Sequence, residues 1–343
     1  ANNPATLATE QELANFYRFS NNISKSNELI TKVVEKKKTI YGETHPNYVQ
    51  ALEDLALTQS LNNKLSEAKT NYKVVIDNTL NYIGNFFSSL NENEKSLYWE
   101  KTNLRLQRFY SFAYTYGKTD KELIKQFYNT LINTKGFLLN NSSKIRNIIS
   151  SSTDESLKTS YTQWLETKEN LNLAYQLSKE ELTQEKINMD SLQKREDELE
   201  RELSQKSALF KESMNEKPID FNTIQKLLKS NEAIVEIVQL NEYDNGFTGN
   251  ESYLAIVSSP SDVKVIELGA GKVIQKAIGD FREKTINIKS ENEAYNLTWK
   301  ILDEQLKGVS KIYLSLDGAY HQLSINALKD ASGKYLIDKY SIQ

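Results

Sequence analysis

The chain lacks cysteine altogether, and its 343 residues include only two histidines, His45 and His321. Without cysteine, this chain can form no disulfide, hold no metal through a thiolate and use no cysteine nucleophile. Two histidines are also too few for a histidine-rich metal site. We therefore expect no metal and no cofactor, and we assign no catalytic residue to this stretch of sequence.

Long apolar runs and a surplus of positive charge are missing as well. No stretch approaches the roughly 18 apolar residues of a membrane span, and the first residues, ANNPATLATE, lack the basic start and apolar core of a signal peptide. The formal net charge of -3 and the isoelectric point near 5.8 argue against a nucleic-acid-binding surface. The basic triplet at residues 36–38 is interpreted as a solvated helix face. These features predict a soluble, cytoplasmic protein.

Proline and glycine are sparse between residues 11 and 215, where apolar residues recur at the three- and four-residue spacing of helices. An internal echo supports a repeat architecture: three positions in one predicted helix match three positions 42 residues later. The matched pairs are Ser26 with Ala68, Ile30 with Tyr72 and Val33 with Val75. The pattern predicts an α-solenoid.

The connector between these helices, YGETHP at residues 41–46, resembles the tetratricopeptide repeats (TPR) whose units are joined by a G-x-x-H-P segment. His45 is interpreted as a connector or capping residue beside Pro46, in preference to a ligand or a base. Stacked helical pairs leave a concave groove, which the resemblance assigns to a protein partner. We expect the two helices to meet through Leu52, Leu55, Ala56, Ala68 and Tyr72, with Gln59 standing where an aromatic residue is common.

Residues 161–212 carry 8 basic and 12 acidic side chains around a heptad-like series of apolar residues. Polar residues interrupt that series, which favours a long intramolecular helical hairpin over a coiled-coil dimer. The series is Leu182, Met189, Leu192, Leu199 and Leu203, and the interruptions are Glu185, Glu196 and Lys206. Lys217 and Pro218 mark the predicted end of this region, because proline disfavours helical geometry in the residue before it.

After Pro218 the pattern alternates between strands and helices, which is typical of an α/β domain. We expect strands at 233–240, 253–258 and 263–268, helices at 223–229, 273–288 and 293–306, and a further strand at Ile312, in one mainly parallel sheet. In the stretch at 311–339, a strand containing Ile312, Leu314 and Leu316 precedes a turn at Asp317 and Gly318. A second apolar run and a turn at Gly333 follow it; the run is Leu323, Ile325, Ala327 and Leu328.

This stretch resembles the CHAT domain, a bacterial relative of the caspases and separases. That family has an apolar strand, a D-G turn, an LPFEAL-like segment and then G-x-x-L; this chain reads LSLDGAYHQLSINAL and GKYL, with Ser324 and Ile325 in place of Pro and Phe. The upstream segments AIVEIVQL, SYLAIV and VKVIELG also resemble strands of that family, in the same order. The resemblance covers roughly residues 221–343.

The resemblance implies a TPR-CHAT protein with three regions: helical repeats at 1–160, a helical hairpin or connector at 161–217, and the amino-terminal part of a caspase-like domain at 218–343. The family's catalytic His and Cys lie beyond the matched stretch. We therefore expect the amino-terminal portion of a cysteine endopeptidase whose repeats receive an activating or regulatory partner, as in antiviral defence. Its other expected partners are a protein substrate and the carboxy-terminal half of the domain. The alternative is a non-enzymatic helical scaffold with a degenerate α/β cap.

Two further motifs do not indicate a functional site. GAGKV at 269–273 is not a phosphate-binding loop, because Ile266 stands where the first glycine is needed and Val273 where Ser or Thr is needed. Asp317, His321 and Ser324 have the side chains of a hydrolase triad within eight residues, but such triads usually draw on separate loops, so His321 is interpreted as a surface or capping residue. Because a caspase-like sheet needs about six strands, we also expect this segment alone to leave one face and one edge uncovered. A covering element is then required, either the carboxy-terminal half of the domain or the helical arm folding back.

Overall fold

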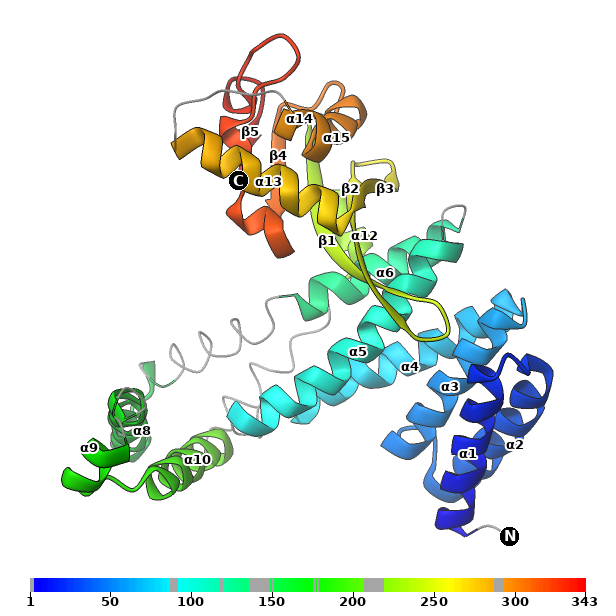
Figure 1. Cartoon of the computed structure of the whole chain (residues 1–343), viewed down its shortest axis with the longest axis vertical. Helices are drawn as coiled ribbons and strands as arrows, with labels where there is room; N and C mark the ends of the chain where they lie inside the picture. The colour runs from blue at the N-terminus through cyan, green and yellow to red at the C-terminus, as the bar shows by residue number, and fades with distance from the viewer. Residues whose placement is uncertain are drawn as a thin grey trace. The chain divides into compact units, whose positions relative to one another are not determined.

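The computed structural model describes residues 3–86, 92–117, 120–135, 149, 151–174, 177, 179–206, 219–286 and 293–343. The chain divides into two compact units: the first comprises residues 1–76, 105–132 and 219–343, and the second 77–104 and 133–218. Most described residues are helical, and all strands of the described chain belong to one five-stranded sheet near the carboxyl end (Figure 1). The predicted combination of a helical region with an α/β region is confirmed. None of the described helices is long and apolar enough to cross a membrane.

Six helices form the amino-terminal region. They are α1 (Pro4–Phe19), α2 (Ile23–Tyr41), α3 (Pro46–Leu61), α4 (Leu65–Phe86), α5 (Glu92–Tyr116) and α6 (Lys121–Thr134). The side chains of Asn3, Asn22 and His45 cap the first three helices by accepting a backbone N–H, and α1 and α3 begin with proline, whose fixed φ suits the first helical position. Local sequence therefore sets where these helices begin.

The 42-residue echo marks equivalent buried positions in α2 and α4. All six echoing side chains are at most 1% exposed, and Leu52, Leu55 and Ala56 of α3 are buried as predicted. Gln59 is also buried, and its side-chain amide bonds to Glu67 (2.9 Å) and Asn71 (2.8 Å). The polar residue is tolerated here because its hydrogen bonds are satisfied.

His45 has the capping role that the sequence predicts. Its Nδ1 accepts a hydrogen bond from the backbone N–H of Asn47 (3.1 Å), and its ring stacks on Tyr41 with centroids 4.6 Å apart. Gly42 between the two helices has φ +82, a conformation that favours glycine. The connector is thus an ordered turn in which both Nδ1 and the ring of His45 make local contacts.

The sheet has the strand order β3-β2-β1-β4-β5. Its strands are β1 (Glu232–Tyr243), β2 (Phe247–Ser258), β3 (Val263–Ala270), β4 (Lys311–Ser315) and β5 (Ser341–Ile342), preceded by α12 (Phe221–Leu227). β1 pairs with β4 and β4 with β5 in parallel, whereas the β1–β2 and β2–β3 pairs are antiparallel. The predicted mainly parallel sheet is therefore wrong, and the sheet is mixed. The reason is the tight turn at Asn245 and Gly246, an Asn-Gly hairpin signal that forces β2 to run back along β1.

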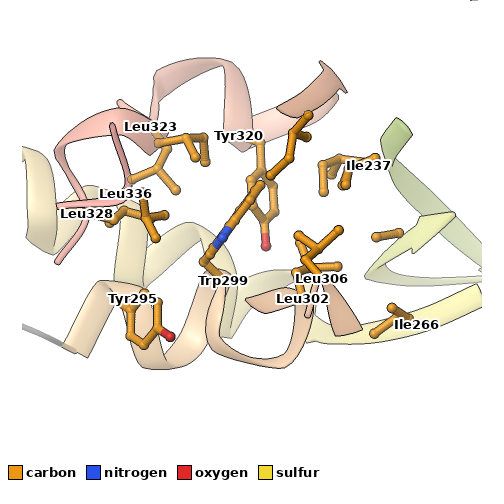
Figure 2. Packing of buried hydrophobic residues seen from close by; sticks show 14 of the residues in the cluster. Ile237, Ile266, Tyr295, Trp299, Leu302, Leu306, Tyr320, Leu323, Leu328 and Leu336 are labelled. Atoms are coloured by element: carbon orange, nitrogen blue, oxygen red, sulfur yellow. The ribbon is translucent and has the colours of Figure 1, made fainter. Parts of the chain in front are cut away.

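One face of the sheet builds the main hydrophobic core. Helices α13 (Gly271–Ile286), α14 (Glu293–Thr298) and α15 (Lys300–Gln305) cover this face (Figure 1). The helix predicted at 293–306 is interrupted at Trp299, which leaves helical geometry (φ -130) and buries its indole completely. Figure 2 shows the Trp299 side chain beside Tyr320, among leucines from the segments before and after β4. Packing of this large side chain accounts for the break.

The segment after β4 folds as short 3-10 helices packed on the core. They span Gly318–Gln322, Ile325–Ala327 and Leu336–Asp338. The predicted turn is present: Asp317 accepts the N–H groups of Gly318 (2.9 Å) and of Gln239 on β1 (3.0 Å). Gly318 has φ +54, and a Cβ there would collide with the Gln239 side chain, so only glycine fits. Of the predicted apolar run, Leu323, Ile325 and Leu328 are buried and Ala327 is partly exposed.

In the second unit, α8 (Glu155–Ala174) and α10 (Met189–Lys206) pack as an antiparallel pair, with the short α9 (Lys179–Gln184) between them. Ser160 bonds to Glu202 (3.1 Å) and the Trp164 indole N–H donates to Glu196 (3.1 Å), so partners run in opposite directions along the two helices. The two helices thus run antiparallel within one chain. Glu196, which interrupts the apolar series, is buried and serves as the indole's acceptor. The predicted boundary at residues 217 and 218 lies outside the described residues.

Ile312 on β4 offers a test of the core. It is fully buried, whereas Leu314 and Leu316 of the same predicted strand are only partly buried and Leu316 follows its last residue. Replacing Ile312 by Ala should lower the free energy of unfolding by about 2–5 kcal/mol, because the lost side chain leaves a cavity. The control, Ile337→Ala, removes a side chain that is 60% exposed and should change stability by no more than about 0.5 kcal/mol. Urea unfolding followed by circular dichroism measures both, and equal losses would contradict this description of the core.

Candidate functional site

The residues weighed as a possible hydrolase triad do not form one. His321 and Ser324 are exposed, and Asp317 is occupied by the backbone N–H groups of the turn. No hydrogen bond joins the three side chains in this fully described segment. The interpretation of His321 as a surface residue agrees with its exposure.

The glycines of GAGKV have a packing role. Gly269 has φ +136, and Gly271 begins α13 against β2, where an added Cβ would lie 2.7 Å from the Cβ of Glu251. The close approach of α13 to the strand therefore accounts for Gly271. Among the described residues, no group of three or more His, Asp or Glu side chains is placed to hold a metal ion.

A buried polar network connects the helices of the first unit to the β1–β2 hairpin. We define the polar network as Gln11, Asn15 and Arg18 of α1, Lys37 of α2, Glu53 and Asp54 of α3, Arg105 and Arg108 of α5, and Tyr243 and Asn245 of the hairpin. Buried charges are rare unless they are paired, so a cluster of this size is a candidate for a functional constraint.

Glu53 is the most deeply buried charge of the polar network. Its side chain is fully shielded from solvent, and its two carboxylate oxygens accept separate bonds from Arg105 Nε (2.8 Å) and Arg108 Nη1 (2.7 Å). Arg105 also donates to Gln50 of α3 (3.1 Å). Charge-assisted bonds of this kind are stronger than neutral ones, and they fix the register of α3 against α5.

Asp54 anchors the network to α1 and α2. One of its carboxylate oxygens accepts bonds from Gln11 Nε2 (2.5 Å) and Asn15 Nδ2 (3.2 Å), and the Gln11 carbonyl oxygen accepts a bond from Lys37 Nζ. Burial raises the pKa of the Asp54 carboxyl, as does the nearby Glu53 charge, and burial lowers the pKa of Lys37. The predicted solvated face at residues 36–38 is wrong for Lys37, which is buried because its amino group reaches this interior cluster; Lys36 pairs with Glu10 (3.0 Å) nearer the surface.

The tip of the β1–β2 hairpin binds to Arg18, which is itself buried. Arg18 donates to the Tyr243 hydroxyl (3.0 Å) and to Asn245 Oδ1 (2.7 Å), and Asn245 Nδ2 donates back to the Arg18 carbonyl (2.9 Å). The guanidinium of Arg108 lies over the rings of Tyr243 and Phe247, at 6.0 and 5.8 Å from their centroids. Arg108 therefore contacts both the buried carboxylate of α3 and the hairpin.

Helix α5 also holds the backbone of β1 directly. Ser111 Oγ accepts the N–H of Tyr243 (3.2 Å) and donates to its carbonyl (3.3 Å), while Gln107 accepts the N–H of Asn241 (2.9 Å). Side chains thus satisfy β1 backbone groups where its register with β2 shifts, between Asn241 and Tyr243. The junction is a continuous chain of hydrogen bonds from α2 to the sheet.

A cavity of about 480 Å³ lies on the sheet face opposite the main core. It is lined by Tyr128 of α6, Ile224 and Leu227 of α12, Leu228, Ile234 of β1, Tyr313, Leu314 and Ser315 of β4, and Gln343. Tyr128 packs edge-on against Phe221, and Asn129 accepts the Phe221 N–H (2.6 Å), so α6 and α12 cover part of this face. The helical region thus covers part of this face, as in the second of the two expected alternatives.

Sequence reasoning missed both the polar network and the cavity. The Asn-Gly pair at 245 and 246 is a hairpin signal that the sequence does contain. The partners of Glu53 and Arg18 lie 52 to 227 positions away in the chain, and no local pattern specifies such pairs. Comparison of the chain with protein-family models, with curated proteins and with solved structures gives no match.

Glu53→Gln tests the centre of the polar network. The amide can accept from only one arginine and carries no charge, so we expect a loss of about 3–5 kcal/mol in the free energy of unfolding, the usual cost of breaking a buried ion pair. The matched control is Glu28→Gln, which removes the exposed pair with Lys32 and should change stability little. Urea unfolding of both variants gives the comparison; a small effect at Glu53 would show that the pairing does not hold α3 to α5.

Asp54→Asn tests the sign of a pH effect. Because the pKa of Asp54 is raised in the folded state, the native protein binds this proton more tightly than the unfolded chain does. The protonated carboxyl therefore favours folding below its unfolded pKa of about 3.9. This stabilisation is lost as the pH rises through the folded pKa. The variant's stability relative to wild type should therefore rise between about pH 4 and pH 7. Glu28→Gln is the control, because the pKa of Glu28 is lowered and not raised and its carboxyl is exposed, so the stability of this variant relative to wild type should not rise over the same range. A difference in stability between Asp54→Asn and wild type that does not change with pH would contradict the raised pKa of Asp54.

Proposed function

We propose that this chain is the sensor and scaffold portion of a CHAT-type, caspase-like cysteine endopeptidase. In this proposal the helices form a TPR-like α-solenoid whose groove binds an activating or regulatory protein, and the α/β region is the amino-terminal half of the peptidase domain. The observation that carries the proposal is the segment from β4 to β5: a strand that buries Ile312, an Asp-Gly turn, an apolar run packed on the core, and then a parallel strand.

The helical region supports the repeat part of the proposal. The echo residues of α2 and α4 occupy equivalent buried positions, and the connector at 41–46 turns on Gly42 and is capped by His45. Helical pairs with such spacing stack through their buried faces and leave the other surface for binding. A protein partner fits this region better than nucleic acid, since the net charge of the chain is -3.

The polar network supports a regulatory link between the two regions. A partner that shifts α1 or α3 would disturb Arg18 and Glu53, and through Arg108 it would disturb the hairpin that continues β1. β1 pairs directly with β4, whose carboxyl end is where open α/β sheets place functional groups. Partner binding is thereby coupled to the region in which the family carries its catalytic groups.

The chemistry would be supplied by residues outside this sequence, because the chain contains no cysteine. In the family, a histidine activates a cysteine thiolate that attacks the peptide carbonyl and forms an acyl-enzyme. The partners in this proposal are thus the regulatory protein, the carboxy-terminal half of the domain and a protein substrate, in a cytoplasmic setting such as antiviral defence. The rival proposal is a non-enzymatic scaffold with an α/β cap.

The reading frame beyond the codon for Gln343 separates these two proposals. We expect it to continue with a strand ending in His-Gly and a later strand ending near Ser-Ala-Cys. The longer protein should then react with a peptidyl acyloxymethyl-ketone probe, and its Cys→Ala variant and the 343-residue chain should not. A stop codon, or a continuation without these motifs, would support the scaffold and overturn the peptidase.

A further inference from the structure

Arg18 of α1 is a buried charge whose hydrogen-bond acceptors, within the described residues, are all neutral oxygens. It is 3% exposed, and its guanidinium donates to the Tyr243 hydroxyl (3.0 Å), to Asn245 Oδ1 (2.7 Å) and to Asn15 Oδ1 (3.5 Å). Its Nε–H has no acceptor in the part of the chain that the structure describes. Asp54, a carboxylate of the same network, accepts its bonds from side-chain amides instead. A carboxylate placed on Arg18 would form stronger, charge-assisted bonds than these neutral oxygens do.

Arg108 of α5 contacts the same hairpin side chain. Its guanidinium lies over the ring of Tyr243, whose hydroxyl accepts from Arg18. Glu53 is the carboxylate bonded to Arg108, and it also accepts from Arg105, so one negative charge serves two guanidinium groups. The polar network as a whole holds four basic and two acidic side chains, so positive charge is in excess where the helices meet the hairpin. We refer to this part of the helices as the arginine surface, formed by Arg18 of α1 and by Gln107, Arg108 and Ser111 of α5.

The part of the hairpin that covers the arginine surface is acidic. We define the hairpin tip as residues 242–250, EYDNGFTGN, which contain Glu242 and Asp244 and no basic residue. In this described segment neither carboxylate bonds to an arginine: Glu242 accepts from Ser252 within the hairpin (2.5 Å), and Asp244 is exposed. The hairpin tip therefore matches the arginine surface in the sign of its charge but leaves Arg18 without a carboxylate.

The hairpin tip can leave the helices without breaking the sheet. Strand β4 pairs with β1 only at residues 232–236, and β3 pairs with β2 only at residues 252–258. Beyond these positions β1 and β2 form a two-stranded ribbon, and a ribbon of two strands is marginally stable by itself. No residue of the hairpin tip is fully buried, so the main core does not depend on it.

We propose that the arginine surface binds an acidic segment of the regulatory protein, with a carboxylate on Arg18, and that the hairpin tip is the chain's own competitor for this surface. The planar guanidinium of Arg18 can hold both oxygens of a carboxylate, whereas the tip offers it a hydroxyl and an amide. An aromatic residue beside the carboxylate would take the place of the Tyr243 ring under Arg108. Partner binding thereby releases Tyr243 from Ser111 and frees the end of β1.

The arginine surface belongs to the helices to which the proposed function assigns a regulatory protein, so this proposal rests on that assignment and not on the peptidase. It adds the place of binding, the acidic chemistry of the partner and the competition with the hairpin tip. The two proposals fail separately. The peptidase is decided by the reading frame, and the arginine surface by peptide binding to the 343-residue chain.

The test uses the full 343-residue chain as wild type and as a shortened variant. The shortened variant replaces residues 242–250 by Asn-Gly, which joins the paired residues Asn241 and Glu251 by a two-residue turn. The probes are a fluorescein-labelled cyclic peptide of residues 239–251 and its Asn245→Asp analogue. Both should bind the shortened variant at least about tenfold more tightly than wild type, whose own tip competes. The analogue should bind the shortened variant about tenfold more tightly than the unmodified peptide, because its carboxylate meets Arg18.

Hydrogen exchange of the wild-type chain supplies a measurement that does not depend on the shortened variant. The Tyr243 amide donates to Ser111 Oγ (3.2 Å), and we expect it to exchange faster when a saturating concentration of the Asn245→Asp probe displaces the hairpin tip. A probe that binds without changing this exchange would be bound elsewhere, which would contradict competition for the arginine surface.

A matched pair of arginine variants, made in the shortened chain, identifies the group that binds the probe. Arg18→Gln should weaken binding of the Asn245→Asp probe at least about tenfold. Arg282→Gln is the control, because it removes the same charge from an exposed arginine of α13 whose partner, Gln322, is also neutral, and it should leave binding nearly unchanged. Equal binding of the two probes, equal effects of the two variants, or tighter binding of an oligouridine RNA than of the probe would overturn the proposal.

Discussion

The buried carboxylate of Glu53 is the constraint on which the first unit depends. A fully desolvated charge is tolerable only when its partners are held in place, and here the partners come from a helix more than 50 positions later in the chain. Arg108 meets this requirement and also lies over Tyr243 and Phe247 of the hairpin. The pairing of Glu53 on α3 thus fixes the position of α5, and α5 in turn holds the end of β1.

The sequence identifies those elements of the fold that depend on local chemistry. Adjacent residues specify the start of a helix at Pro46, the turn at Gly318 and the alternating strand that contains Ile312. The structure contains all three. The direction of β2 was mispredicted although Asn245 and Gly246 carry the signal, because apolar alternation reports a strand and not its orientation. The interruption of a helix at Trp299 is a tertiary effect, since the gain from burying the indole exceeds the local preference for helix.

The sequence contains the residues of the polar network but does not indicate that they lie together. Glu53 and Asp54 look like surface residues of a repeat helix, and Lys37 looks like part of a basic face; their burial follows from partners on other helices. No periodicity in one segment encodes such partners. What the sequence does reveal is that positions 42 residues apart in α2 and α4 correspond, and the structure buries both members of each pair, although Ile30 and Tyr72 differ in size.

Both faces of β1 are packed, and this links the two halves of the first unit mechanically. Ala233, Val235 and Ile237 face the Trp299 core, whereas Val238 and Leu240 are buried on the opposite face, toward the helices. A close-packed strand shared by two cores cannot shift toward one without disturbing the other. Arg18, Arg108 and Ser111 all contact Tyr243 at the hairpin end of this strand. A shift of the helices that carry them would therefore move β1, and with it the paired strand β4. The antiparallel return of β2 creates the hairpin that Arg18 of α1 and Ser111 of α5 bind.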